Sequence, residues 1–271
     1  MVRWVFLLGA PWTVGSPAGA QTWQLIREVR LPPPVRVSVD RYHRIFVGDA
    51  EGGIRQYDGD GQLLLTYSPP KVGAISLLEA WNTTKIFAFS RDLQQYTLLD
   101  RFLAPLTQNE LDPDRIGFAR NATLAADDQL WVLDDTDFSL KKYDPRTQTV
   151  TLNAPLNRVL DGREYDLTFL REYQNVLFLN DRHAGILVFD NLGNYRKTLP
   201  FAGLDYFGLL NEELYFLREN RIHFFHLYAS TERTLDLPTQ QPGRQARYAL
   251  VFENRVVLFY GEAMAIYRME K

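Results

Sequence analysis

Acidic side chains recur directly after short apolar runs in this chain, and they are the first residues that could do chemistry. Asp49 follows the run Ile45-Phe46-Val47, and Asp134 with Asp135 follows the run Leu130-Trp131-Val132. Other charged or titratable residues stand after later runs. We predict that these positions share one mostly acidic ligand-binding surface, made of Asp49, Asp134, Asp135, Asp181, His183, Arg218 and Glu262.

Such a surface suits three kinds of ligand. Converging carboxylates could hold Ca²⁺, which takes roughly six to eight oxygen ligands; they could also bind a basic peptide or the hydroxyls of a sugar. The alternative is structural, because an Asp side chain in a turn accepts hydrogen bonds from nearby backbone amides. The recurrence of Asp at equivalent points favours the structural role, and both interpretations stay open. We expect no bound cofactor, with Ca²⁺ as the one candidate.

Other catalytic chemistry has no signature in this sequence. It contains no G-x-S-x-G elbow, no phosphate-binding P-loop and no G-x-G-x-x-G motif. Two of the 4 histidines, His223 and His226, are three residues apart on an expected strand. They therefore face opposite sides of that strand and make poor shared metal ligands. We predict no catalytic residue.

The acidic positions belong to a repeated frame. In each repeat a short apolar strand and a polar turn precede an apolar triplet, and a loop and a third strand follow it. The triplets begin roughly 40 residues apart. They are Ile45-Phe46-Val47, Ile86-Phe87-Ala88, Leu130-Trp131-Val132, Val176-Leu177-Phe178, Leu214-Tyr215-Phe216 and Val256-Val257-Leu258.

These repeats indicate strands rather than helices, because turn residues come roughly every 8–12 positions and the apolar runs between them are rich in β-branched and aromatic residues. Six units of four short strands are typical of a β-propeller. We predict an all-β, six-bladed β-propeller with four-stranded blades over residues 21–271. The second unit is the loosest: we expect its outer strand near residues 102–106 and an inserted loop over 107–120.

The two ends of the chain complement each other. The last unit stops after three strands, while an extra strand, expected over residues 23–31, precedes the first unit. Its ending, Val29-Arg30-Leu31-Pro32, matches the fourth-strand ending Lys197-Thr198-Leu199-Pro200. We therefore predict that this N-terminal strand pairs in the last blade and closes the ring.

The opening unit also carries a recognisable spacing. A Pro, an apolar strand ending in Asp, an apolar triplet followed by Asp, and the pattern Ile-x-x-Tyr-Asp-x-x-Gly occur at Pro34, Asp40, Asp49, Ile54, Tyr57, Asp58 and Gly61. This unit resembles an NHL repeat. The chain as a whole is similar to a divergent six-bladed propeller of the NHL or TolB-like kind.

That resemblance specifies a blade and leaves the activity open. Such families include modules that bind proteins or glycans and enzymes such as lactonases. A lactonase-like propeller would place a Glu, two Asn and an Asp around Ca²⁺ in the channel. The candidates here, Glu79, Asn121, Asn211 and Glu253, are not at one equivalent level of the repeats, so we do not transfer those ligands.

The N-terminus has the layout of a secretory signal peptide. Arg3 precedes a short apolar core, Trp4 to Leu8, and Ala18-Gly19-Ala20 forms a small-x-small cleavage pattern. We predict a signal peptide over residues 1–20 and a mature chain that begins at Gln21. No later segment of the sequence is apolar enough to span a bilayer.

Composition narrows the class of partner. The 271 residues include 30 basic and 33 acidic side chains, a formal net charge of −3, which argues against bulk attraction to nucleic acid. There are 0 cysteines, so disulfides and thiolate chemistry are excluded. We expect an exported bacterial protein, periplasmic or extracellular.

The function that fits these features best is recognition. We expect a non-catalytic binding or scaffold propeller that recognises a protein, peptide or envelope glycan through one loop-lined face. Tyr165, Tyr206, Phe207 and Tyr248 lie near the variable loops and could anchor a partner if exposed. The alternative is a Ca²⁺-dependent lactonase or hydrolase.

Overall fold

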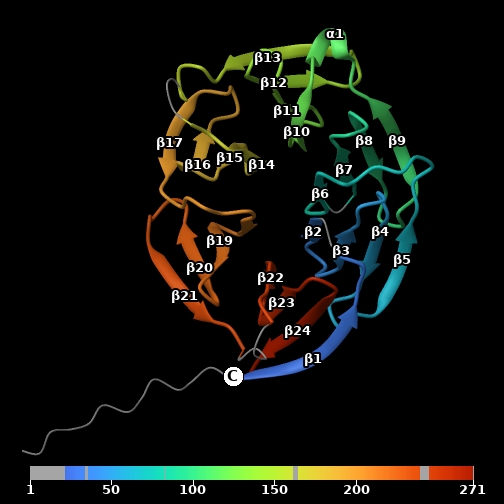
Figure 1. The fold of residues 1–271 in the computed structure, drawn as a ribbon, viewed down its shortest axis with the longest axis vertical. Helices are drawn as coiled ribbons and strands as arrows, with labels where there is room; N and C mark the ends of the chain where they lie inside the picture. Colours follow the sequence, from blue (N-terminus) through green and yellow to red (C-terminus); the bar gives the residue numbers. More distant parts are fainter. Residues whose placement is uncertain (1–21, 34–35, 83, 161–163, 239–243, 271) are drawn as a thin grey trace, which may run out of the picture.

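Six four-stranded antiparallel sheets stand around a ring in the computed structural model, which describes residues 22–33, 36–82, 84–160, 164–238 and 244–270 (Figure 1). In each sheet the first strand of the blade lies toward the centre and the fourth at the perimeter. The predicted six-bladed β-propeller is confirmed. The predicted signal peptide lies outside the described residues.

The strands follow the repeats of the sequence. Blade 1 holds β2 (Arg36–Val39), β3 (Ile45–Gly48), β4 (Ile54–Tyr57) and β5 (Leu63–Tyr67); blade 2 holds β6 (Leu77–Glu79), β7 (Ile86–Ser90), β8 (Gln95–Leu99) and β9 (Pro105–Glu110); blade 3 holds β10 (Ala119–Leu124), β11 (Leu130–Asp134), β12 (Ser139–Asp144) and β13 (Thr149–Pro155). Blade 4 holds β14 (Leu167–Tyr173), β15 (Val176–Asp181), β16 (Gly185–Phe189) and β17 (Tyr195–Leu199); blade 5 holds β18 (Gly208–Leu210), β19 (Glu213–Arg218), β20 (Arg221–His226) and β21 (Glu232–Asp236). Blade 6 holds β22 (Tyr248–Phe252), β23 (Arg255–Phe259) and β24 (Ala263–Met269), with β1 (Trp23–Arg30) as its outer strand.

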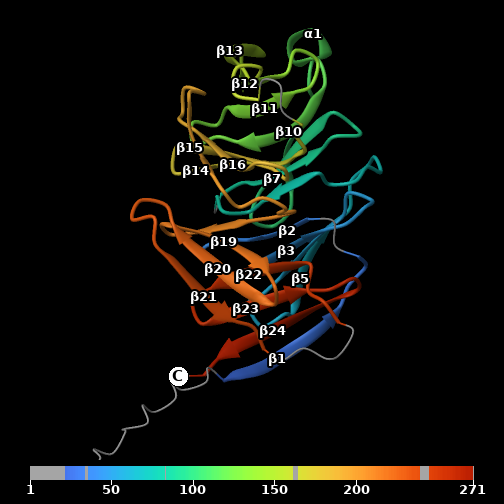
Figure 2. The same cartoon turned by 60° about the vertical axis from the view of Figure 1, so that its left-hand side comes forward.

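The N-terminal strand closes the ring, as the sequence predicts. β1 pairs antiparallel with β24, from Trp23 opposite Met269 to Arg30 opposite Ala263. Figure 2 shows the two strands side by side at the end of the molecule where the C-terminus lies. The edge of β24 is therefore paired, and the first and last strands, β1 and β24, share one sheet.

The second blade departs from the sequence-based prediction. Its outer strand is β9, later than the expected residues 102–106, because Asp100 accepts hydrogen bonds from the amides of Phe102 and Ala104 and so holds that segment in the turn before β9. The expected loop over 107–120 instead contains the end of β9 and a single helical turn, α1 (Pro113–Ile116), whose N-cap is Asp112. Pro113 favours this start because its fixed φ suits the first helical position.

The antiparallel order sorts the connections onto two faces of the ring. The turns between second and third strands, together with the linkers between blades, lie on one face, which we call the loop face. The turns between first and second strands, and between third and fourth strands, lie on the opposite face, which we call the turn face.

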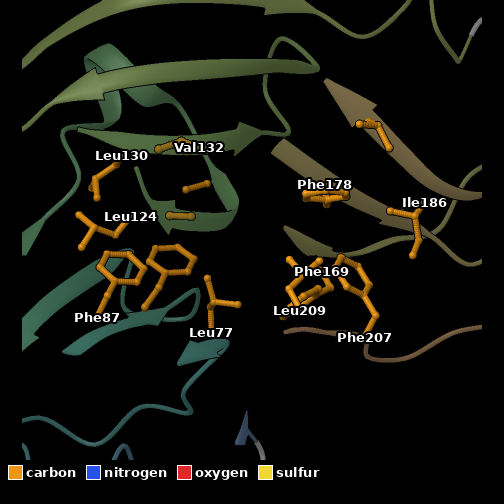
Figure 3. Packing of buried hydrophobic residues seen from close by; sticks show 14 of the residues in the cluster. Leu77, Phe87, Leu124, Leu130, Val132, Phe169, Phe178, Ile186, Phe207 and Leu209 are labelled. Atoms are coloured by element: carbon orange, nitrogen blue, oxygen red, sulfur yellow. The ribbon is translucent and has the colours of Figure 1, made fainter. Parts of the chain in front are cut away.

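The core fills the spaces between neighbouring blades. In Figure 3, Leu77 and Phe87 of blade 2 lie against Leu124 and Leu130 of blade 3, and Phe169 and Phe178 of blade 4 lie near Phe207 of the next linker. The Phe169 and Phe207 rings meet edge to face at 5.0 Å between centroids. Burial of each such side chain stabilises the fold by about 1.5–3 kcal/mol, so each sheet is stable only with its neighbours.

Among the described residues, no helix has the length and apolar character needed to cross a membrane.

Candidate functional site

The residues predicted to bind a ligand all lie on the loop face, because each is the last residue of the second strand of its blade or follows that strand. Backbone hydrogen bonds tie these turns to the linkers beside them. The amide of Asp135 donates to the carbonyl of Phe118, the amide of Arg182 to that of Asp166, and the amide of Leu31 to that of Glu262. The loop face is therefore a continuous surface of turns fixed to linkers.

The three recurring aspartates hold the turns together. Asp134 is fully buried; its carboxylate accepts from the amides of Phe118 and Thr136 and from Lys141 Nζ at 2.6 Å. Such a buried carboxylate is stable because every charge-bearing oxygen has a donor.

Asp49 and Asp181 also accept backbone amides of the turn that follows the second strand of their blades. Asp49 accepts from the amides of Glu51 and Gly53 and pairs with Arg55 at 2.9 Å. Asp181 is fully buried and accepts through Oδ1 from the amides of Asp166 and His183, while its Oδ2 has no hydrogen-bond partner among the described residues. These contacts fit the structural interpretation of the recurring Asp; ligand binding by these residues stays a prediction.

The other four predicted residues are more accessible. Asp135 accepts from Arg120 Nε at 2.7 Å, and the side chains of His183 and Glu262 are exposed at separate points of the ring. Arg218 lies over the ring of Phe216 and lines a cavity. The seven predicted residues thus lie at separate points of the loop face, and of the seven only Arg218 lines this cavity.

That cavity lies between blades 5 and 6 on the loop face, and we call it the rim cavity. Its volume is about 770 Å³, within the range of ligand sites in proteins. The linker before β18, the end of β19, the linker before β22 and the β23–β24 turn form its walls. Its basic and aromatic lining consists of Arg218, Arg244, Arg247, Tyr206, Tyr215, Phe216, Tyr248 and Tyr260. Two acidic residues, Asp205 and Glu219, also line it.

The tyrosines of the rim cavity are placed by packing. Gly208 in β18 stands opposite Tyr215 in β19, and the absence of a Cβ at Gly208 leaves room for the Tyr215 ring. Tyr206 meets Tyr248 edge to face at 5.8 Å. Burial raises the pKa of the Tyr206, Tyr215 and Tyr260 phenols. All three therefore remain protonated hydrogen-bond donors near neutral pH.

The arginines differ in how strongly they are engaged. Arg244 pairs with Glu28 at 2.8 Å and lies over the Tyr260 ring at 3.9 Å. Arg218 donates to the carbonyl of Ala202 at 2.5 Å. The side chain of Arg247 is exposed. Rigid aromatic walls with arginines at the edge can accept a polar or acidic group together with an apolar one.

A second group of charged residues lies among the inner strands. Glu79 in β6 and Arg171 in β14 approach to 3.9 Å, and Glu79 is 2% exposed. The Glu79 carboxylate accepts from the Thr123 hydroxyl at 2.8 Å and from the Leu124 amide at 3.2 Å. Desolvation raises the pKa of Glu79 to about 7, against the opposing effect of Arg171.

In the sequence, Glu79 stands out only as an out-of-pattern candidate metal ligand, and nothing singles out Arg171. The available signal was a charged side chain inside a short apolar inner strand, as in Leu77-Leu78-Glu79. That signal is weak, because the partner of Glu79 comes from a blade two repeats later.

Within the described residues, no group of three or more His, Cys, Asp or Glu side chains is arranged to hold a metal ion. The Ca²⁺ candidate stays a prediction.

Comparison with solved structures identifies similar folds. Virginiamycin B lyase from Staphylococcus aureus has a TM-score of 0.60 and 9% identity, covering 92% of this chain and 100% of that one. A streptogramin B lyase structure has a TM-score of 0.60 and 13% identity, covering 92% and 98%. The Pan2 WD40 domain of Neurospora crassa has a TM-score of 0.64 and 9% identity, covering 92% and 96%.

At these identities the similarity shows the propeller fold alone. No sequence profile of a known family and no curated protein matches the chain.

Proposed function

We propose that this chain is an exported, non-catalytic binding propeller that recognises a protein or peptide of the cell envelope through its loop face. The observation that carries the proposal is the rim cavity, where four tyrosines and three arginines line about 770 Å³ between two rigid blades. Tyr and Arg are the residue types that contribute most to binding at protein interfaces. An envelope glycan is the alternative ligand, because tyrosine hydroxyls and arginines also bind sugar hydroxyls.

The scaffold supports this role. The linkers differ in length and sequence while the sheets that carry them repeat, and variable loops on a rigid frame suit recognition. The fold is shared with a lyase and with a WD40 domain, so the fold leaves both catalysis and binding open. The Asp-capped turns and the Ile54-x-x-Tyr57-Asp58 spacing support an NHL-like or TolB-like blade.

Export belongs to the same proposal. Arg3, the apolar run Trp4 to Leu8 and the Ala18-Gly19-Ala20 pattern support a cleaved signal peptide. Mass spectrometry of the protein from producing cells is expected to find a mature N-terminus at Gln21. An intact Met1 on the accumulated protein would overturn the export part of the proposal.

The binding part is tested by removing charge from one face at a time. We expect the double variant Arg218→Ala/Arg247→Ala to lose specific proteins from an envelope co-purification quantified by mass spectrometry. The matched control, Arg101→Ala/Arg146→Ala, removes the same charge from exposed turns of the turn face and is expected to keep them. Identical profiles for the two double variants would contradict the assignment of the loop face.

The alternative enzyme, a Ca²⁺-dependent lactonase or hydrolase, makes a different prediction. It requires stoichiometric metal in the purified protein and a chelator-sensitive melting temperature. Elemental analysis of the protein and melting with and without chelator distinguish the two functions.

A further inference from the structure

A second cavity opens on the turn face and runs inward between the inner strands, and we call it the axial cavity. Its volume is about 580 Å³, and its lining includes Arg171, Tyr173, Tyr206, Tyr215 and Trp81. We propose that the axial cavity binds an organic carboxylate, a monoanion with an aromatic or apolar body, whose carboxylate is held by Arg171 and the Tyr206 hydroxyl. Tyr206 and Tyr215 also line the rim cavity, whereas Arg171 lines the axial cavity alone. The proposal originates from Arg171 and therefore does not rest on the loop-face function.

Arg171 is the origin of the proposal. Its side chain is 8% exposed, and its Nε finds no hydrogen-bond acceptor among the described residues. A guanidinium buried to this degree is ordinarily paired with an anion in a bidentate geometry. Here the nearest carboxylate, on Glu79, is 3.9 Å from Nε, which is beyond hydrogen-bond distance.

Glu79 compensates this charge only in part. Its two oxygens already accept from Thr123 and Leu124. Burial raises the pKa of Glu79 to about 7, so near neutral pH the carboxyl is protonated in a large fraction of molecules. In those molecules Arg171 is a buried cation facing a cavity, which is an environment that favours an entering anion.

Two phenols can complete the site. Arg171 and Tyr206 line the same cavity, and the guanidinium lies near enough to the Tyr206 phenol to oppose the burial that raises its pKa. The Tyr206 hydroxyl keeps its proton and can donate it to a ligand. The Tyr215 hydroxyl accepts from the Val251 amide at 3.4 Å and likewise has a proton to donate. The donors at the inner end of the cavity are therefore one guanidinium and two hydroxyls.

The side chains that line the axial cavity indicate the chemistry of the rest of the ligand. Tyr173, Trp81 and Phe252 present rings to the cavity, and rings of this kind pack against aromatic or apolar groups. Several polar residues at the mouth have partners: Glu213 with Arg233 at 2.7 Å, Asp40 with Arg44 at 2.6 Å, and His43 with Glu253 at 3.7 Å. Arg41 also lines the mouth, but it is exposed, so solvent and salt screen its charge. The buried end of the cavity, rather than its mouth, therefore selects charge.

The charges at the inner end of the axial cavity favour a monoanion over a phosphate dianion. A single guanidinium neutralises one charge, and the second charge of a dianion would lie buried beside Glu79 without a partner. An unpaired buried charge is strongly unfavourable. A carboxylate also matches the planar donor geometry of arginine.

The experiment measures binding of four probes to the purified protein by isothermal titration calorimetry. Benzoate and benzamide represent a free aromatic acid and its neutral analogue. N-acetyl-phenylalanine and its amide represent the C-terminus of a peptide. We expect each acid to bind at least about tenfold more tightly than its amide, because a hydrogen bond to a charged group contributes more than a neutral one. The stronger of the two acids identifies the source of the carboxylate.

Variants locate the site. Arg171→Gln is expected to abolish the preference for acid over amide, and Tyr206→Phe, which keeps the ring and the fold, to weaken acid binding by about threefold to tenfold. The matched control is Arg233→Ala, because Arg233 lines the mouth of the same cavity. We expect this substitution to change the affinity for each acid by less than about twofold.

Three results would overturn the proposal. These are an equal affinity for acid and amide, no binding of either acid up to about 10 mM, and acid binding that the folded Tyr206→Phe and Arg171→Gln variants retain unchanged. Since Tyr206→Phe removes a single oxygen, the test remains decisive if Arg171→Gln does not fold.

Discussion

At the scale of single residues, one side-chain type serves two purposes in this protein. Asp49, Asp134 and Asp181 hold turns by accepting backbone amides. Glu79, also an acid and also buried, faces a cation that it only partly neutralises. The difference lies in where their partners come from. The aspartates accept from amides of their own turn or the adjoining linker, whereas Glu79 accepts from Thr123 and Leu124 of the next blade and lies 3.9 Å from Arg171, two blades away.

Asp134 provides the most direct test of the structural role. We expect Asp134→Ala to lower the free energy of unfolding by about 3–5 kcal/mol. It removes the acceptor of the Phe118 and Thr136 amides and leaves Lys141 with the more exposed Asp137 as its remaining anion. Urea denaturation measures this change. Glu262→Ala, at an exposed position of the same loop set, is expected to change it by no more than about 0.5 kcal/mol. Equal effects of the two substitutions would disprove the structural role of Asp134.

The raised pKa of Glu79 predicts that the free energy of unfolding decreases as the pH rises. Its pKa is about 7 in the folded chain, against the ordinary value of 4.5. The folded state therefore binds the proton more tightly than the unfolded state, so stability falls as pH rises from about 4.5 through 7.

The variant Glu79→Gln cannot titrate at this position. We expect its free energy of unfolding, relative to that of the original protein, to rise by roughly 2–3 kcal/mol between pH 5 and pH 8. Urea denaturation at the two pH values measures this difference. A difference that stays constant with pH would show that Glu79 is not the titrating group.

Much of this local chemistry follows from the sequence and some of it does not. Asp49 and Asp134 recur at one point of a repeat, so their common role could be predicted from spacing. Arg171 and Glu79 could not be paired in advance, because strands from blades 2 and 4 meet only after the ring has formed. The register of β9 was also predicted wrongly, since the turn chemistry of Asp100 determines where that strand begins.

At the scale of elements, the inner strands decide what faces the cavities. β18 has only three residues, and Gly208 at its start lies opposite Tyr215. This pairing lets the Tyr215 ring lie across β18, where it lines both the rim cavity and the axial cavity. The position of one glycine in a short strand thus fixes a wall that the two cavities share.

A methyl group at this position is expected to displace that wall. In Gly208→Ala the new Cβ would lie 2.0 Å from Tyr215 Cζ, so the ring must move, at a cost of about 1–3 kcal/mol in the free energy of unfolding. Thermal melting measures the loss. The control is Gly261→Ala, whose Cβ would meet nothing within 4 Å; a loss of similar size there would rule out the steric explanation.

At the scale of the whole molecule, the ring depends on a strand from the opposite end of the chain. β1 completes blade 6 and contributes Ile26 and Val29 to the core between blades 6 and 1. Its removal would expose both that core and the edge of β24. The sequence predicted this closure from two incomplete repeats, whereas the positions of the cavities depend on how six blades meet and have no local signature.

Truncation tests the closure. We expect a chain that lacks residues 21–31 to melt on the order of 10 °C below the chain that begins at Gln21, or to lose its cooperative transition. A synthetic peptide of residues 22–31 added in trans is expected to restore part of the loss. Identical melting curves for the two chains would show that the ring does not require β1.

Binding of a partner by the loop face through the rim cavity can be tested by photocrosslinking in the producing cell. A photoreactive amino acid replaces Gln245, which is exposed and lines the rim cavity. The same residue replaces Thr147, exposed on the turn face, as the control. We expect a discrete crosslinked species from position 245 that Arg218→Ala weakens, and none of that size from position 147. The same species from both positions, or none from position 245, would contradict it.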